Sequence, residues 1–324
     1  MSRWRASSPV SAAISRAALK QRARDYFAAA GVLEVDTPAL SVAAGSDPNI
    51  ESLVVRAELS PNRRLFLHTS PEFCMKRLLA DGYPDIYSIC RVFRDGEAGH
   101  RHQPEFTMIE WYRRGFGMQA IIDDTLALLA AALQQPEGSR PADQLEYAQA
   151  FRQYADLDPE HASIDELATR AAADTDLRQT LGGDRDAWLD LLLATVVAAQ
   201  FATDRLTVVR HYPASQAALA RRCPANERVA DRFEVFMGEV ELANGYVELT
   251  DAAEQARRID DELQKRAKAG KRANSVDNAF LAALREGLPE CAGVAVGLER
   301  LQMLRDNTDN IGDVVTFVFG QEND

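Results

Sequence analysis

Residues 85–114, DIYSICRVFRDGEAGHRHQPEFTMIEWYRR, predict a long β-hairpin closed by a basic loop. Ile86 to Phe93 and Phe106 to Tyr112 are rich in β-branched, aromatic and other apolar residues, whereas the segment between them is polar and interrupted by glycines. Arg94 follows the first strand, and Glu110 lies in the middle of the second among apolar residues. Because a charged group is costly to bury without a partner, this pattern indicates a hairpin that binds a ligand.

The loop of this hairpin concentrates groups that can carry positive charge. His100 and His102, two of the five histidines of the chain, flank Arg101. Phosphate is the natural ligand for such donors. A solvated surface loop without a ligand is the alternative, because loops of this composition are common.

Length and composition describe an ordinary globular chain. Its 324 residues are 46% hydrophobic, which is enough for a sizeable core in one large or two small domains. The formal net charge of -12 opposes non-specific attraction to nucleic acid, so we expect no stable binding of tRNA.

We expect a cytoplasmic protein that does not enter a membrane. Its four cysteines are scattered without a CxxC pair, which is typical of reduced thiols and gives no metal site. The first residues lack the apolar core of a signal peptide. The best apolar run, Leu189 to Ala199, is too short to span a bilayer and predicts a buried helix.

Three acidic residues recur at equal spacing in a second predicted hairpin, which turns at Gly238. Glu234, Glu241 and Glu248 lie seven residues apart on strands whose other residues are apolar. Half-buried carboxylates need cations, and Mg²⁺ or the ammonium group of a substrate would supply them. Exposed acids on the wet face of a hairpin are the alternative.

Small or helix-starting residues mark three further places where a ligand could approach. Asn244 and Gly245 predict a turn that brings backbone and amide groups close to a ligand. The small residues before Arg300 would allow a nucleotide to approach the backbone closely, and the guanidinium of Arg300 could then bind its γ-phosphate. Glu72 falls in the first turn of a predicted helix, where favourable interaction with the helix dipole is a sufficient explanation.

The remaining pattern predicts helices and strands in a fixed order. Residues before Ile14 look like a loose arm, and a mainly helical region is expected between residues 115 and 205, with a capping box at Ser163 to Glu166. The other predicted elements are helices at 14–30, 120–133, 145–156, 163–173, 188–201, 252–269 and 277–286, and strands at 32–37, 47–60, 64–69, 206–212 and 311–319.

Three segments resemble the signature motifs of the class II aminoacyl-tRNA synthetases. FRDGEAGHRHQPEFTMIEWY resembles motif 2, the helix that ends at Gly31 with the strand before Pro38 resembles motif 1, and the small residues leading to Arg300 resemble motif 3. The resemblance implies an α+β fold with an antiparallel sheet flanked by helices. It also implies one catalytic domain over residues 1–324, a helical insertion at about 118–204, and a homodimer.

The same resemblance implies an ATP site with Mg²⁺. Arg94 would hold the α-phosphate, Phe106 would stack on adenine, and Arg94 with Arg300 would be the catalytic residues. Glu234 and Glu241 would coordinate the metal. The ATP-binding residues carried over in this way are Arg94, Asp95, Gly96, His102, Gln103, Phe106, Glu241, Leu242, Gly297 and Arg300. One departure concerns adenine, because Gly96 stands where the family usually has a glutamate and Glu97 follows it.

Two segments, HTSPEFCMKRLL and FEVFMGEVELANGYVELTD, resemble the lysine branch of these enzymes. They imply a pocket for a lysine-type amino acid, in which Glu248, Glu72 and Tyr112 would bind the amines and Asn244 would orient the carboxylate. The residues carried over are Ser70, Pro71, Glu72, Tyr112, Asn244, Glu248 and Ala295.

The position of motif 1 in the chain indicates which molecule accepts the acyl group. That motif begins near residue 14, which leaves no room for the anticodon-binding domain of a lysyl-tRNA synthetase. The chain therefore resembles the family of stand-alone lysine ligases that act on elongation factor P. This resemblance implies adenylation of (R)-β-lysine, or lysine, and transfer to a lysine ε-amine of elongation factor P. Ser70 and Ala295 agree with it, because tRNA enzymes tend to have alanine and glycine there.

Two other functions stay open from the sequence. The first is an appendage-free enzyme that charges tRNA with lysine, which would place labelled lysine on tRNA. The second is a non-catalytic relative that senses lysine or a nucleotide, which would bind the amino acid without turning over ATP.

Overall fold

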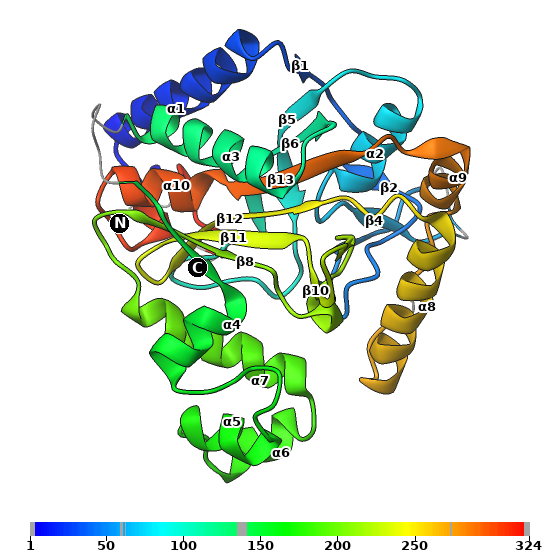
Figure 1. The fold of residues 1–324 in the computed structure, drawn as a ribbon. Coiled ribbons are helices and arrows are strands. Elements are labelled where there is room, and N and C mark those ends of the chain that lie inside the picture. The colour runs from blue at the N-terminus through cyan, green and yellow to red at the C-terminus, as the bar shows by residue number, and fades with distance from the viewer. Residues whose placement is uncertain (1–3, 59–60, 62, 135–140, 273, 321–324) are drawn as a thin grey trace.

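The computed structural model describes residues 4–58, 61, 63–134, 141–272 and 274–320. Its centre is a mixed sheet with the strand order β1-β5-β6-β13-β12-β11-β8-β7 (Figure 1). The two outermost pairs, β1 with β5 and β7 with β8, are parallel, and the inner pairs are antiparallel. The strands, in spatial order, are Leu33–Glu34, Ile86–Phe93, Glu105–Arg114, Cys291–Gly297, Val240–Val247, Arg232–Met237, Leu206–Arg210 and Asp143–Glu146.

Three helices cover one face of this sheet. They are α1 (Val10–Ala29), α3 (Met118–Leu133) and α10 (Leu298–Arg305) (Figure 1). Phe27 of α1 stacks on Tyr87 of β5 with ring centroids 4.2 Å apart, and Trp111 of β6 donates to Asp124 of α3 at 3.0 Å. Each such buried aromatic contributes about 2 kcal/mol through burial of its apolar surface. Alternate residues of a strand point to opposite faces of the sheet. Glu110 and Tyr112, which precede and follow Trp111 in β6, therefore both point away from these helices.

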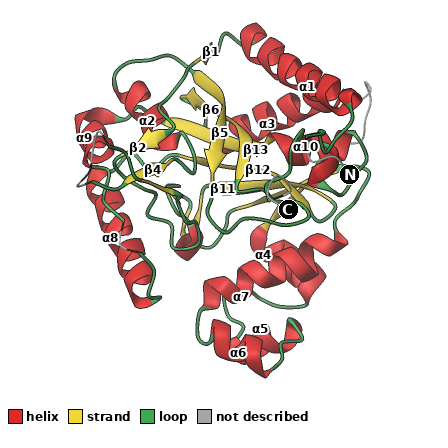
Figure 2. Ribbon diagram, turned by 180° about the vertical axis from the view of Figure 1, so that it is seen from behind, coloured by secondary structure: helices red, strands yellow, loops and turns green. Residues whose placement is uncertain are grey.

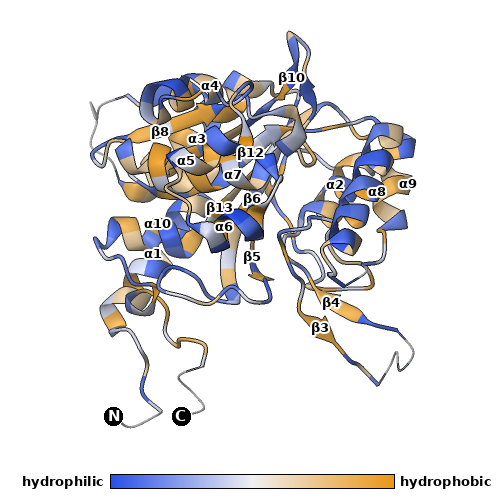
Figure 3. Ribbon diagram, turned by 90° about the horizontal axis from the view of Figure 1, so that it is seen from below, coloured by the Kyte–Doolittle hydropathy of each residue, from blue (hydrophilic) through white to orange (hydrophobic). Residues whose placement is uncertain are grey.

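The opposite face is covered by a second group of elements. Phe73 stacks on Phe280 with centroids 4.5 Å apart, which joins α2 to α9. Together with α8, these helices bury Met75 and Tyr112 in one cluster. The elements on this side are α2 (Glu72–Ala80), α8 (Ala252–Lys268), α9 (Asn278–Gly287), β2 (Leu40–Ser41), β3 (Val54–Val55), β4 (Leu65–Leu67), β9 (Arg222–Cys223) and β10 (Asn226–Ala230). Figure 3 shows hydrophobic residues gathered on the central strands, whereas α8 is largely hydrophilic.

A helical lobe projects from the sheet beyond β7 and β8 (Figure 2). It has its own core around Trp188, which joins the sheet through Val209 and Phe236. Its helices are α4 (Tyr147–Ala150), α5 (Ile164–Arg170), α6 (Thr175–Leu181) and α7 (Arg185–Leu192), with π-helical turns at Phe151–Ala155 and Leu193–Val197. The capping box predicted at Ser163 is confirmed, since its side chain and that of Glu166 bond each other's backbone N–H. No helix in the described ranges is both long and apolar enough to cross a membrane.

Several predictions of local structure are wrong. Helix α1 begins at Val10 and not at Ile14, because Gln302 of α10 donates to the Ala12 carbonyl and ties this turn to the body of the protein. The helix predicted from residue 145 begins instead as strand β7, since residues 143–146 pair with β8, and tertiary pairing overrides local propensity.

The strand predicted at 311–319 is a 3₁₀ turn over Ile311–Asp313. Within the described residues this segment pairs with no strand of the sheet. It packs instead on the loop of the β5–β6 hairpin, where the Ile311 N–H donates to the His100 carbonyl at 2.9 Å. Residues 59, 60 and 62, at the end of one predicted strand and in the turn after it, lie outside the described residues.

Candidate active site

The β5–β6 hairpin, β11, β12, β13 and the start of α10 form the wall of one cavity of about 470 Å³. The loop over residues 41–52 and the start of α2 close its other side. The end lined by Arg94, His102 and Arg300 is here called the nucleotide end, and the end lined by Glu72, Glu110 and Glu248 is called the amine end. The cavity is lined by Ser70, Glu72, Arg94, His102, Gln103, Phe106, Tyr112, Glu234, Glu241, Leu242, Asn244, Glu248, Ala295, Gly297 and Arg300, all predicted site residues.

Arg94 and Phe106 form the hairpin's contribution to the nucleotide end. The guanidinium of Arg94 lies over the Phe106 ring at 5.1 Å, and its Nη1 donates to Glu97 Oε1 at 3.4 Å. The buried Nε of Arg94 has no hydrogen-bond partner among the described residues. A buried donor without a partner is costly, so this atom fits an anionic ligand that would accept its hydrogen bond.

Gly96 shapes the turn beside Arg94. Its φ of 81° is strained for a residue with a side chain, so glycine allows this turn. Asp95 and Gly96 are exposed outside the lining of the cavity, whereas Glu97 faces it. The structure thus brings a carboxylate to the cavity one residue after the position where the motif usually has it.

Arg300, in the first turn of α10, joins the hairpin to β12. Its Nη1 donates to the carbonyl and Oε2 of Glu241 at 3.2 and 3.3 Å. Its Nη2 donates to His102 Nε2 at 2.7 Å, which makes that ring nitrogen an acceptor. Burial and the charge of Arg300 lower the pKa of His102. His102 is therefore a neutral neighbour of the nucleotide end, and Gln103 donates to its carbonyl at 3.1 Å.

Glu234 of β11 and Glu241 of β12 both line the cavity, although the strand register pairs Glu234 with Asn244. Glu234 accepts from Tyr212 at 2.8 Å and from Arg232 at 2.6 Å. Burial and the charge of Glu241 raise the pKa of Glu234 to about 7. Two carboxylates that repel each other in this way are a donor set suited to a hard divalent cation, and each oxygen keeps a lone pair for it. The residues present therefore fit Mg²⁺.

Three carboxylates meet at the amine end. Glu110 accepts from Ser70 and from Tyr112, each at 2.7 Å. Burial and the charge of Glu72 raise the pKa of Glu110 to about 7, and burial is the main cause that raises the pKa of Glu248 to about 8. Groups with pKa values near neutrality can exchange protons as a cationic ligand arrives.

Lys76 connects two of these carboxylates. Its Nζ lies 2.6 Å from Glu72 Oε1 and 2.5 Å from Glu248 Oε2, and its side chain is 1% exposed. The Tyr246 hydroxyl donates to Glu72 Oε1 at 2.5 Å. The protein therefore supplies one cation to the carboxylates for which the sequence predicted a substrate amine. Burial keeps the pKa of Glu248 raised, although the charge of Lys76 lowers it.

Glycines on the two central strands make room for this arrangement. A Cβ on Gly293 would lie 2.4 Å from the Tyr112 ring and 2.6 Å from Glu248 Oε1. The turn predicted at Asn244 and Gly245 is wrong, because both residues lie within β12. Asn244 still faces the cavity and accepts from Arg232 at 3.3 Å. Gly245 is needed because a Cβ there would lie 2.7 Å from the Phe233 ring.

The predictions from the sequence omitted some residues of the site and included others that do not line the cavity. Pro71, like Asp95 and Gly96, does not line the cavity. Lys76 had a signal, since it follows Glu72 by one helical turn, and so did Glu110, a carboxylate in an apolar strand. Arg232 also had a signal, since it lies two residues before Glu234 on the same face of one strand. Tyr246 had none, because its partner Glu72 comes from another element. The residues missed as site residues are Lys76, Glu97, Glu110, Arg232 and Tyr246.

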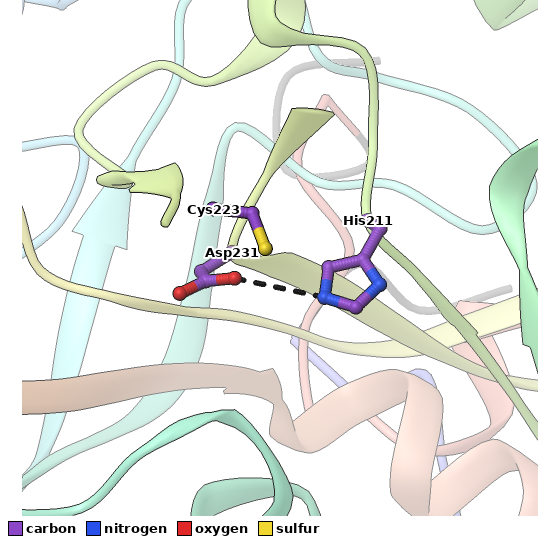
Figure 4. Close-up of side chains that lie close together, drawn as sticks. All are labelled: His211, Cys223 and Asp231. Atoms are coloured by element: carbon purple, nitrogen blue, oxygen red, sulfur yellow. Dashed lines mark ion pairs between the residues drawn. The ribbon is translucent and has the colours of Figure 1, made fainter. Parts of the chain in front are cut away.

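A separate cluster lies where β8 ends, β9 passes and β11 begins, outside the lining of the cavity. Ligand atoms of His211, Cys223 and Asp231 lie within 4.8 Å of one another (Figure 4). His211 Nδ1 lies 2.6 Å from Glu146 Oε2, and its Nε2 lies 3.6 Å from Asp231. The two carboxylates raise the pKa of His211 to about 10, which favours a protonated ring that pairs with both acids. These ion pairs account for the cluster, and we assign no metal to it.

Comparison with known proteins agrees with this geometry. The family described as tRNA synthetases class II (D, K and N) matches residues 2–321. The chain belongs to this family of class II synthetases. Over nearly its full length it is similar to proteins named elongation factor P--(R)-beta-lysine ligase. The one from Klebsiella pneumoniae (strain 342) is 42% identical over 319 residues, which are 97% of each chain. Those from Hamiltonella defensa (strain 5AT) and Edwardsiella ictaluri (strain 93-146) are each 41% identical over 322 residues, which are 97% and 98% of both chains.

Proposed function

We propose that this protein adenylates (R)-β-lysine with ATP and transfers it to a lysine ε-amine of elongation factor P. The observation that carries the proposal is one cavity with buried carboxylates at the amine end and, at the nucleotide end, Arg300 and Arg94, whose Nε has no partner among the described residues. A diamino acid fits the first end and a polyphosphate the second. The names of the relatives supply the acceptor and the β-isomer. The Ser70 and Ala295 that the resemblance associates with this isomer both line the cavity.

In the first reaction, a carboxylate oxygen of the amino acid attacks the α-phosphorus of ATP. A new P–O bond forms, the bond to the β-phosphate breaks, and pyrophosphate leaves. Arg94, beside the Phe106 ring that would carry adenine, would stabilise charge on the α-phosphate. Arg300 would do the same toward the terminal phosphate. The catalysis is positional and electrostatic, with no protein nucleophile.

Glu234 and Glu241 would hold Mg²⁺, which neutralises phosphate charge when bound. Arg232 keeps Glu234 in place through the 2.6 Å contact, and Asn244 through the 3.3 Å contact. In the second reaction, the acceptor's neutral ε-amine attacks the acyl carbon. An amide bond forms, the amine loses a proton and AMP leaves.

Mass spectrometry of elongation factor P provides the direct test. After incubation with this protein, ATP and (R)-β-lysine, we expect one acceptor lysine to gain the mass of a lysyl group. Omission of ATP should abolish the gain, and Arg94→Ala is the matched variant that should slow it strongly. Labelled lysine on tRNA and none on elongation factor P would instead show the tRNA-charging activity. Binding of lysine without pyrophosphate exchange would instead indicate the non-catalytic protein that senses lysine or a nucleotide.

We also propose that one catalytic unit with a helical insertion acts as a homodimer in the cytoplasm. The dimer follows from the resemblance of residues 14–38 to motif 1. It is supported by apolar side chains exposed on or near this segment, namely Val10, Ile14, Leu33, Leu40 and Val42. Light scattering of the purified protein should give twice the mass of one chain, and a monomer at micromolar concentration would contradict the dimer.

A further inference from the structure

The amine end holds a positive charge of its own, which the proposed reaction does not use. Lys76 lies below the carboxylates and does not itself line the cavity, whereas Glu72, Glu110 and Glu248 do. Its Nζ is enclosed by two of these carboxylates and by the rings of Tyr246 at 5.4 Å and Phe280 at 5.8 Å. The ammonium is therefore a fixed internal counter-ion.

The contacts of Lys76 leave part of each carboxylate for a ligand. Lys76 and Tyr246 both contact Glu72 through Oε1, and Lys76 contacts Glu248 through Oε2. The buried Glu248 Oε1 has no hydrogen-bond partner among the described residues. An unpaired buried acceptor is costly until a donor reaches it.

The charges at the amine end sum to a definite value. With Glu72, Glu110 and Glu248 ionised and Lys76 protonated, this group of four side chains carries −3 + 1 = −2. Glu262 and Asp277, which also line the cavity, are not part of this group. A diamino acid with both amines protonated brings +2 to this end, while its carboxylate points to the nucleotide end. Without Lys76, the same end would keep one buried negative charge uncompensated, and buried charge of one sign strongly favours protonation.

We propose that Lys76 is a positioning residue that orients Glu72 and Glu248 and matches the charge of the amine end to a substrate with two ammonium groups. The inference rests on the proposed function, because it concerns the selection of the diamino acid. Lys76 touches neither substrate nor nucleotide, so it acts only through the carboxylates.

Protonation provides a readout that distinguishes this role from packing. The titratable groups that face Lys76 come from several elements: Glu72 of α2, Glu110 and Tyr112 of β6, Tyr246 and Glu248 at the end of β12, and Cys291 of β13. Lys76 lowers the pKa of Glu248 and of Glu110. Removal of its charge should therefore move the pH dependence of diamino acid binding upward, whereas a loss of packing alone should not.

The test measures the dissociation constant of (R)-β-lysine from pH 6 to 9 by calorimetry in the wild type, in Lys76→Met and in Lys76→Met/Glu72→Gln. In Lys76→Met, we expect affinity at pH 7.5 to fall about 30-fold and the pH midpoint to rise by about one unit. The double variant restores the charge of −2, so its midpoint should return to the wild-type value, although loss of Glu72 keeps its affinity low. A non-hydrolysable ATP analogue should bind all three within about threefold.

An unchanged midpoint in folded Lys76→Met overturns the proposal. If Lys76→Met does not fold, thermal unfolding of the double variant decides, because a charge role predicts that it folds and a packing role predicts that it does not. A wild-type protein that binds neither (R)-β-lysine nor lysine would contradict the proposed function instead.

Discussion

The two ends of the cavity differ in how their charges are compensated. At the amine end, the Lys76 and Glu248 side chains are 1% and 0% exposed, and the protein itself pairs them. At the nucleotide end, the Arg300 and Glu241 side chains are 30% and 38% exposed, and the buried Nε of Arg94 has no partner among the described residues. The first end is thus assembled before a ligand binds, whereas the second is completed by one.

This difference indicates that the two ends have different functions. Charges in a dry environment interact strongly, so a misplaced or missing ammonium at the amine end is costly and the substrate can be selected there. Water screens the charge of partly exposed arginines, so these side chains contribute less to the choice of substrate. They can still stabilise the negative charge that develops on the phosphates during the reaction. We therefore expect substitutions at the amine end to change amino acid recognition more than substitutions at the nucleotide end change ATP recognition.

The largest effect is expected for Glu248→Gln. Loss of this buried charge should lower kcat/KM for (R)-β-lysine in pyrophosphate exchange about 1000-fold, because breaking a buried ion pair costs about 3–5 kcal/mol. The KM for ATP should stay within about threefold. Glu239→Gln, a change outside the cavity lining, is the matched control. An equal rise of both KM values would contradict the division into two ends.

Arg94→Ala should have the next largest effect and act on the other end. We expect kcat for pyrophosphate exchange to fall about 100-fold, because one charged donor to the developing phosphate charge is lost. The KM for (R)-β-lysine should change little. Arg94→Lys should recover only part of the rate, since it restores the charge but not the planar guanidinium over Phe106. Full activity in Arg94→Ala would remove Arg94 from the mechanism.

The same contrast explains which parts of the molecule the sequence could predict. The hairpin over residues 86–112 and the acids Glu234, Glu241 and Glu248 were predictable, because a charge within an apolar strand is a local pattern. The pairing of Lys76 with Glu248 was not, since it joins a helix to a strand far away in the chain. The strand predicted at 311–319 failed for a related reason, because this segment contacts the hairpin loop at His100, far away in the chain, and no local pattern reports that contact.

Phe106→Ala should produce a smaller effect, confined to the nucleotide end. Loss of the ring removes the stacking surface proposed for adenine, which is worth about 1–3 kcal/mol for a base, so KM for ATP should rise about tenfold. It also removes the surface on which the Arg94 guanidinium lies. Phe106→Tyr keeps the ring and should stay close to wild type. If GTP and ATP lose affinity equally from a similar starting value, the ring stacks without contributing to the choice of base.

The smallest effect is expected from pH alone, and it tests whether the amine end is charged before the substrate arrives. Burial raises the pKa of Glu110 to about 7 and of Glu248 to about 8, above the usual value near 4.5. A carboxyl group with a raised pKa in the folded state stabilises the protein fully below its unfolded pKa, and this stabilisation is lost as pH rises through the folded pKa. The free protein should therefore lose part of its stability between about pH 5 and pH 8.

A bound diamino acid should oppose this loss, because its ammonium groups favour the ionised carboxylates. The increase in unfolding temperature produced by saturating (R)-β-lysine should therefore grow from pH 6 to pH 8.5, while KM for the amino acid falls about fivefold over the same range. The increase produced by an ATP analogue without Mg²⁺ should change less, because His102 is already neutral and Glu234, whose pKa is also raised to about 7, is assigned to the metal. Equal pH dependence for both ligands would mean that the carboxylates are ionised in the free protein, and that the contrast between a buried and an open end does not extend to their protonation.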